Sequence, residues 1–174
     1  MADLEWENRK EDFYSNLIAR EGGGKPVRDS GGWTRFGISE KAHGKDYVIF
    51  NLDEDTAKDI YRKHYTKRGE ERFGKTPEAL KFMDMEVNMG YGNAMKVAQR
   101  ALNSLLPENE KITVDGGYGS KTKKAIETIQ ENFSSQIIIN AIKDKQKNYY
   151  NFLEDIDKYP GWEARSLYDP IKES

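Results

Sequence analysis

Two carboxylates stand close together in a glycine-rich stretch near the N-terminus. Glu21 precedes the run Gly22-Gly23-Gly24, Asp29 follows eight residues after Glu21, and Thr34 follows five residues after Asp29. Two acids and a hydroxyl at such a turn can supply a general acid, a second carboxylate and a hydrogen-bond partner for water. The glycines would let a substrate approach the backbone closely. The stretch therefore predicts acid–base chemistry.

Glu21 continues the apolar face of the helix expected before it. Leu17 and Ile18 precede it at helical spacing, so its carboxylate is expected to lie against the core. Burial and the negative end of the helix dipole both favour the protonated carboxyl, which a general acid needs near neutral pH. The alternative is a capping glutamate, or one that forms an ion pair with Arg20 or Arg28.

Asp29 and Thr34 lie beyond the glycine break. A second carboxylate opposite the first could stabilise an oxocarbenium-like transition state or orient water, and a threonine hydroxyl could hold that water. The alternative for Asp29 is an Asx-turn residue that opens the sequence Asp-Ser-Gly-Gly. Both interpretations of Asp29 stay open at this point.

Glycine-rich motifs elsewhere do not fit known ligand loops. A phosphate loop would need glycines where Asp115 and Ser120 stand. A dinucleotide fingerprint would need one at Met95, and a calcium loop starting at Asp115 would need a glutamate at Ile126. Two scattered histidines and no cysteine argue against a metal site. These motifs are expected to be turns.

Helices are the elements that must position the acids. The apolar pattern predicts a helix that ends near Glu21, one that Asp53 caps, and one that Thr76 and Pro77 open. An interruption at Gly90 precedes further helices that extend to about residue 153. The prediction is a mainly α, compact chain.

Little β-structure is expected. Thr34, Phe36 and Ile38 would point to one side if extended, which allows at most a small hairpin near the turn that carries the acids. Near the C-terminal end of the last helical segment, Tyr149, Tyr150 and Phe152 stand at helical spacing and are expected to pack in the interior.

Composition narrows the classes of partner. Charged residues make up 33% of the chain and apolar residues 36%, and the net charge is −2, which suits a soluble globular protein. The chain has no unbroken block of Lys and Arg, so its charge pattern does not indicate binding to nucleic acid. No apolar run has the length of a signal peptide or a membrane span. Synthesis in the cytoplasm without membrane insertion is expected, and action elsewhere would need an export partner.

Several side chains are candidates for binding sugar. Trp33, Tyr91 and Trp162 stand beside or close to glycines, where exposed rings could stack on sugar rings, although aromatic residues more often belong to the core. Asn88 could hydrogen-bond a sugar. The alternative is a buried polar pair between Asn88 and Asp84, four residues apart on one helical face.

Together these motifs resemble glycoside hydrolase family 108, the lysozyme-like N-acetylmuramidases of bacteria and their prophages. The resemblance rests on REGG followed by DSGGWTRFGIS. Downstream, FMDMEVNMGYGNAMKVAQRALN and VDGGYGSKT resemble the predicted peptidoglycan-binding region of that family, and GWEAR resembles its closing motif. The resemblance covers residues 10–166.

The resemblance implies a lysozyme-like helical fold with a catalytic region over 8–88 and a helical peptidoglycan-binding region over 89–168, packed as one compact unit. Glu21 matches the catalytic glutamate. The implied reaction is hydrolysis of the β-1,4 bond between N-acetylmuramic acid and N-acetylglucosamine, without metal or organic cofactor. Alternatives are a lytic transglycosylase and a non-catalytic peptidoglycan-binding module.

The resemblance also implies where the chain acts. The partner would be the glycan strands of the bacterial cell wall, reached after export or lysis with a holin-like or other export partner. Some relatives are labelled secretion activators, and others act as endolysins of prophages. Lysis, secretion and wall remodelling all remain open as roles, as do the oligomeric state and the retaining or inverting outcome.

Overall fold

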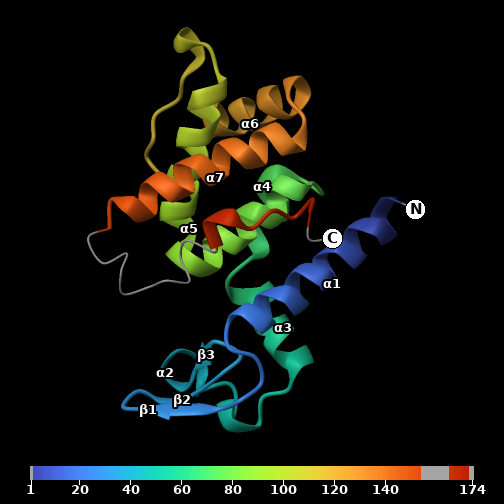
Figure 1. Cartoon of the computed structure of the whole chain (residues 1–174), viewed down its shortest axis with the longest axis vertical. Helices are drawn as coiled ribbons and strands as arrows, with labels where there is room; N and C mark the ends of the chain where they lie inside the picture. Colours follow the sequence, from blue (N-terminus) through green and yellow to red (C-terminus); the bar gives the residue numbers. More distant parts are fainter. Residues whose placement is uncertain (1, 154–164, 173–174) are drawn as a thin grey trace. The chain divides into compact units, whose positions relative to one another are not determined.

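The chain folds mainly into helices, as its apolar periodicity predicts. The structure, a computed structural model, describes residues 2–153 and 165–172. It divides into two compact units, Met1–Thr66 and Lys67–Ser174, whose elements are labelled in Figure 1. The predicted functional boundary between residues 88 and 89 falls inside a helix of the second unit, and that division stays a prediction.

The first unit combines helices with a small sheet. Its helices are α1 (Ala2–Arg20), α2 (Glu40–His43) and α3 (Glu54–His64), with a 3-10 turn η1 (Ile49–Asn51). The strands β1 (Val27–Asp29), β2 (Gly32–Arg35) and β3 (Ile38–Ser39) form an antiparallel sheet in that order.

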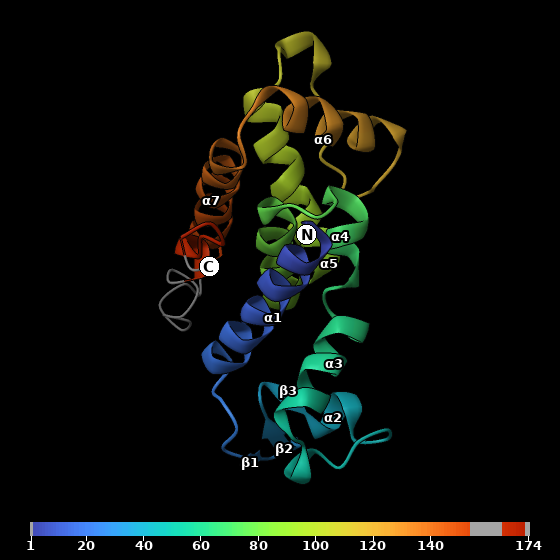
Figure 2. The same cartoon turned by 90° about the vertical axis from the view of Figure 1, so that its right-hand side faces the viewer.

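Helices α1 and α3 pack against each other and form the core of this unit (Figure 2). Phe13 and Leu17 of α1 and Ile60 of α3 are buried. Asp53 caps α3 as predicted, since its Oδ1 accepts a hydrogen bond from the Thr56 N–H at 2.7 Å. These contacts fix the C-terminal end of α1, where Glu21 begins the next turn.

The small sheet agrees with the little β-structure expected, and it contains two tight turns. Phe36 and Gly37 form the turn between β2 and β3, with φ of +53° and +75°, and Arg35 pairs with Ile38 across it. Two positive φ angles are typical of a type I′ hairpin turn. The expectation that Thr34, Phe36 and Ile38 share one side is therefore wrong, because the chain reverses at Phe36.

The second unit is built around one long helix. Its helices are α4 (Lys67–Phe73), α5 (Pro77–Leu105), α6 (Ser120–Asn132) and α7 (Ser135–Asn151), with a 3-10 turn η2 (Glu108–Glu110). Helix α5 packs against α4, α6 and α7. The predicted interruption is a kink in α5 at Gly90, where φ is +72°. Within the described ranges, no helix combines the length and the apolar character needed to cross a membrane.

Candidate active site

Glu21 is the first residue after α1. Its N–H still donates to the Leu17 carbonyl at 2.9 Å, so its backbone completes the last turn of the helix. The side chain is half-buried, next to a helix face that contributes Leu17 and Ile18 to the core. This position agrees with the one expected from helical spacing, and the side chain is neither fully exposed nor fully buried.

Two glycines turn the chain sharply after Glu21. Gly22 and Gly23 have φ of +96° and +61°, in the left-handed region that other residues rarely adopt. The Gly23 N–H donates to the Ile18 carbonyl at 3.1 Å, a bond typical of a Schellman helix end. The Gly23 carbonyl accepts from the Phe36 N–H at 3.1 Å. The turn after Glu21 is thereby tied to the turn between β2 and β3.

Gly37 lies directly against the Glu21 side chain. A Cβ added at Gly37 would lie 2.8 Å from the Glu21 Cβ and 3.1 Å from its Oε2. The same added atom would lie 2.6 Å from the Tyr61 hydroxyl oxygen. Only a residue without a side chain fits there, so the hairpin turn, Glu21 and Tyr61 form one compact group.

Tyr61 and Arg35 hold this group in place, although the sequence analysis did not single them out. The buried Tyr61 hydroxyl donates to the Phe36 carbonyl at 2.8 Å. Arg35 Nε donates to the Gly24 carbonyl at 2.7 Å, and its Nη1 donates to the Phe50 carbonyl at 2.8 Å. These bonds join segments far apart in sequence, so no local spacing could have revealed them.

Tyr65 and His43 form an aromatic cluster next to the ring of Tyr61. The rings of Tyr61 and Tyr65 lie 5.3 Å apart, and the Tyr65 hydroxyl is 2.8 Å from Nε2 of His43. Burial, followed by the nearby His64, lowers the pKa of His43, so the neutral imidazole is favoured near pH 7. Burial also raises the pKa of Tyr65. This group therefore adds no charge next to Tyr61 at neutral pH.

Asp29 forms the turn that its alternative interpretation predicts. It is exposed at the end of β1, and its Oδ1 accepts from the Gly31 N–H at 2.7 Å. This Asx-turn closes the hairpin between β1 and β2, where Asp29 pairs with Gly32. One carboxylate oxygen is thus occupied by the backbone. A catalytic role for Asp29 stays a prediction.

Thr34 and a third carboxylate belong to the same sheet. Thr34 lies in the middle of β2, paired with Val27 and Ser39, and is half-buried. Glu40, the first residue of α2, accepts a hydrogen bond from the Trp33 N–H at 2.8 Å. Glu40 could not be picked out from the sequence, because it follows Ser39 at a helix start and gives no other signal.

Trp33 lies on a partly exposed aromatic surface of the sheet. Its ring centroid is 4.7 Å from that of Phe50, which is exposed. The Arg28 guanidinium lies over Trp33 at 5.5 Å. Stacked aromatic and cationic groups of this kind offer flat faces to a sugar ring.

The remaining predicted sugar contacts belong to the second unit or lie outside the described residues. Asn88 is half-buried, and its Nδ2 donates to the carbonyl of the buried Asp84 at 2.7 Å and to the Asp84 Oδ2 at 3.3 Å, which is the polar pair expected as the alternative. Tyr91 is half-buried under the Arg68 guanidinium, which is 4.6 Å from the ring centroid. Trp162 lies outside the described residues.

Comparison with known proteins agrees with this architecture. A solved structure of SagA from Brucella abortus has a TM-score of 0.68, covering 98% of this chain and 94% of that chain at 21% identity. At this identity the likeness shows a shared fold. No curated protein matches the chain. The model for glycosyl hydrolase 108 matches residues 14–90, a range that contains Glu21, Asp29 and Thr34. The resemblance to this family is thus confirmed over residues 14–90, the segment that matches its model.

Proposed function

We propose that the chain hydrolyses peptidoglycan at the β-1,4 bond between N-acetylmuramic acid and N-acetylglucosamine. The observation that supports this most is the half-buried Glu21 carboxylate, held between a glycine helix end and the side-chain-free face of Gly37. The match of residues 14–90 to a glycosyl hydrolase family model supports cleavage of a glycosidic bond.

In this proposal Glu21 is the general acid. It protonates the glycosidic oxygen as the bond breaks, so that the leaving sugar departs as an alcohol. Asp29 supports the developing positive charge or activates water, and Thr34 holds that water. Carboxyl groups about 5–5.5 Å apart favour retention of configuration, and about 6.5–9.5 Å favours inversion.

Trp33 is the proposed sugar platform beside these residues. Its ring, with Phe50 next to it, would stack on the apolar face of a sugar. Asn88, Tyr91 and Trp162 remain proposed contacts of a peptidoglycan-binding region over 89–168. Action on the cell wall would follow export or lysis, and the release partner would be holin-like or another export protein.

Identification of the product ends tests this proposal. Purified peptidoglycan is incubated with the wild-type chain, and soluble fragments are analysed by mass spectrometry before and after borohydride reduction. Reducing muramic acid ends are expected. Anhydromuramic ends would replace hydrolysis by a lytic transglycosylase reaction. A chain that sediments with the wall yet releases no fragment would be a binding module, and the proposal would be wrong.

A further inference from the structure

A histidine pair lies close to the residues that hold Glu21. His43, the last residue of α2, is buried, and its ring centroid is 5.1 Å from that of His64, the last residue of α3. These are the two histidines of the chain, and the chemistry proposed above uses neither. Histidine changes its charge between about pH 5 and 8, so the pair can respond to pH.

A row of aromatic rings connects His43 with the turn between β2 and β3. Nε2 of His43 is 2.8 Å from the Tyr65 hydroxyl oxygen, and the Tyr65 ring centroid lies 5.3 Å from that of Tyr61. The Tyr61 hydroxyl donates to a carbonyl of that turn at 2.8 Å, and the same turn places Gly37 against Glu21. Helix α2, which ends at His43, also packs against β2 and β3. A displacement of His43 can therefore reach the turn through the rings and through the end of α2.

A proton on His43 would change both the hydrogen bond and the charge at this position. Neutral imidazole has one nitrogen that donates and one that accepts, whereas both nitrogens of imidazolium donate. The Tyr65 hydroxyl could then only accept from His43, and its own hydrogen would have to turn elsewhere. The positive charge would also be largely removed from water, which is costly. The neutral form of His43 therefore fits the observed arrangement.

The surroundings of His43 oppose its protonation. Burial has the largest effect and lowers the pKa of His43, the like charge of His64 lowers it further, and the Asp46 carboxylate acts in the opposite direction. Arg35 of β2 and Glu40 of α2 form hydrogen bonds with backbone groups instead. The lysines nearest in sequence are exposed: Lys41, Lys45 and Lys63. His43 is therefore expected to take up its proton below pH 6.5, the ordinary pKa of histidine.

We propose that His43, with His64 beside it, is a pH-sensitive positioning residue for Glu21. Neutral His43 keeps the rings of Tyr65 and Tyr61, and with them the turn between β2 and β3, in the observed arrangement, and protonated His43 loosens that turn. The effect on catalysis rests on the proposed role of Glu21, whereas the response of the turn does not. A general acid works in its protonated form, so acidification by itself should not slow Glu21. A loss of activity on the acidic side would therefore come from the turn.

The test follows the backbone amide signal of Gly37 by NMR in the labelled full chain carrying Glu21→Gln, in which the neighbouring carboxyl no longer titrates. The ring signals of His43 and His64 are recorded in the same samples between about pH 8 and 5, the range in which histidine titrates. The Gly37 signal is expected to shift with the same midpoint as the His43 ring, below pH 6.5. His43→Gln should abolish this shift. His64→Gln, which removes the like charge, should move the midpoint to higher pH.

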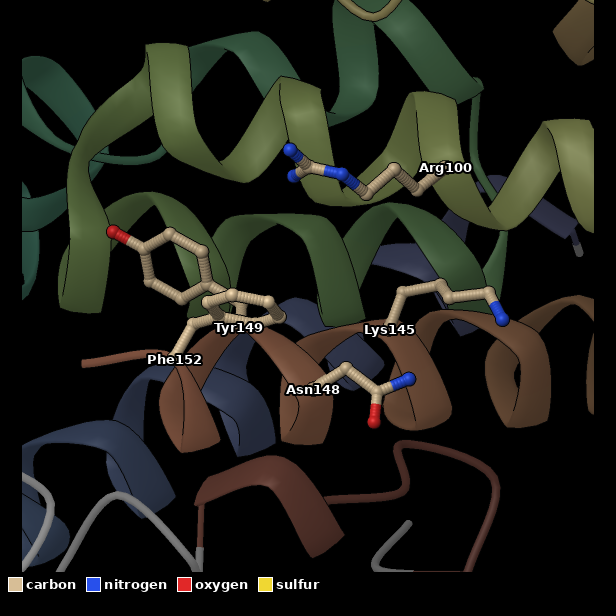
Figure 3. Close-up of a pocket in the computed structure, with 5 residues that line it drawn as sticks. All are labelled: Arg100, Lys145, Asn148, Tyr149 and Phe152. Carbon is tan, nitrogen blue, oxygen red and sulfur yellow. The ribbon is translucent and has the colours of Figure 1, made fainter. Parts of the chain in front are cut away.

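Tyr149 in the second unit provides a matched control for Tyr65. It lines, with Phe152, a groove of about 260 Å³ between α5 and α7 (Figure 3), and it is half-buried, as Tyr65 is. The neighbouring Tyr150 is buried as expected, whereas Phe152 is 89% exposed, so the expectation that it packs in the interior is wrong. Phe152 stands two residues after Tyr150, about 200° around the helix axis at 3.6 residues per turn. The second unit contains no histidine in its sequence.

Tyr65→Phe removes the hydroxyl next to His43 but keeps the ring, and it should reduce the shift of the Gly37 signal. Tyr149→Phe should leave that shift unchanged. Glu86→Gln should leave it unchanged as well, because Glu86, whose pKa of about 7 lies in the same range, belongs to α5. A Gly37 signal that does not move, a shift that persists in His43→Gln, or equal shifts in Tyr65→Phe and Tyr149→Phe would each overturn the inference. If His43→Gln does not fold, the comparison of the two tyrosine variants decides.

Fragment release from peptidoglycan is measured separately over the same pH range. The wild-type rate is expected to fall on the acidic side with the midpoint of the Gly37 signal, and His64→Gln should move this fall to higher pH. A rate that stays constant through that midpoint would overturn the link to Glu21. A chain that releases no fragment at any pH would contradict the proposed function, whereas the NMR titration would still report on the turn.

Discussion

Glu21 is confined by glycines on both sides. Gly22 and Gly23 reverse the chain directly after Glu21. Gly37, in the turn between β2 and β3, has no side chain and so leaves room for that of Glu21. The carboxylate thus has a fixed backbone and a half-buried environment, the two conditions that a general acid needs. The nearby Tyr61 hydroxyl is committed to the Phe36 carbonyl, so it maintains the turn.

Asp29 has a turn role that can be separated from a charge role. Asparagine preserves the Asx-turn to the Gly31 N–H but removes the carboxylate. If Asp29 supports the transition state, Asp29→Asn should lower the rate of fragment release at least about tenfold while the unfolding temperature stays within about 1 °C. Release assays and thermal unfolding check this. Unchanged activity would show that Asp29 stabilises the turn and has no part in catalysis.

The buried carboxyl of Glu86 should make the free energy of unfolding depend on pH. It is buried in α5, neither of its carboxylate oxygens accepts a hydrogen bond from a described residue, and Arg68 Nη1 is 3.8 Å away. Burial raises its pKa to about 7, against the opposing effects of Arg68 and Arg72. Between about pH 4.5 and 7, Glu86 is therefore protonated in the native state but ionised in the unfolded chain. Stability should fall as pH rises through this window, by up to about 3 kcal/mol.

Urea unfolding at pH 5 and pH 8 checks this sign. Glu86→Gln should remove that part of the pH dependence, and the difference between the variant and the wild type isolates it from other titrating groups. Glu71→Gln is the matched control, because Glu71 is an exposed carboxylate on α4 that lies near Arg72. If the difference in free energy of unfolding between the wild type and Glu86→Gln is the same at pH 8 as at pH 5, the account is contradicted.

At the scale of single residues, the sequence predicts those whose role is local. Glu21 follows from helical spacing and the Asx-turn of Asp29 from adjacent glycines. Gly37, Tyr61 and Arg35 could not be predicted, because their contacts with the turn after α1 depend on how the sheet folds back. The aromatic pair of Trp33 and Phe50 is another contact between distant segments.

At the scale of elements, the turn between β2 and β3 is the part that shapes the site. Gly37→Ala combines a positive φ with close contacts, whereas Gly74→Ala has the same φ of about +72° and nothing within 4 Å of an added Cβ. In both variants, backbone strain should lower the free energy of unfolding by about 1 kcal/mol. Gly37→Ala should lose at least about 1 kcal/mol more, since Glu21 and Tyr61 must move.

Urea unfolding and fragment release measure both consequences. Gly37→Ala should also lower activity, because displacing Glu21 disturbs the acid, while Gly74→Ala should retain it. Equal stability and activity of the two variants would show that the contact with Glu21 is unimportant.

Long helices were easier to predict than the sheet. The cap at Asp53 and the break at Gly90 give clear local signals. The strands have two to four residues each, too few for a period of two to be recognised. The turn at Phe36 was missed because an aromatic residue rarely adopts positive φ, and here the surrounding contacts maintain it.

At the scale of the whole molecule, the near-neutral charge is the feature with consequences for binding. A net charge of −2 gives little long-range attraction to an anionic wall. Between about 0.1 M and 1 M salt the screening length falls from about 10 to about 3 Å. Sedimentation of the Glu21→Gln chain with purified peptidoglycan should therefore weaken less than about tenfold over this range. A larger loss would indicate binding driven by net charge.

The central claim is that Glu21 protonates the scissile bond. The measurement is the initial rate at which reducing ends appear from purified peptidoglycan, for the wild type, Glu21→Gln and the control Glu7→Gln, an exposed carboxylate of α1. Thermal unfolding verifies that each variant is folded. We predict that Glu21→Gln lowers the rate about 10²–10⁴-fold and that Glu7→Gln leaves it unchanged. A folded Glu21→Gln chain with activity near that of the wild type would contradict the account.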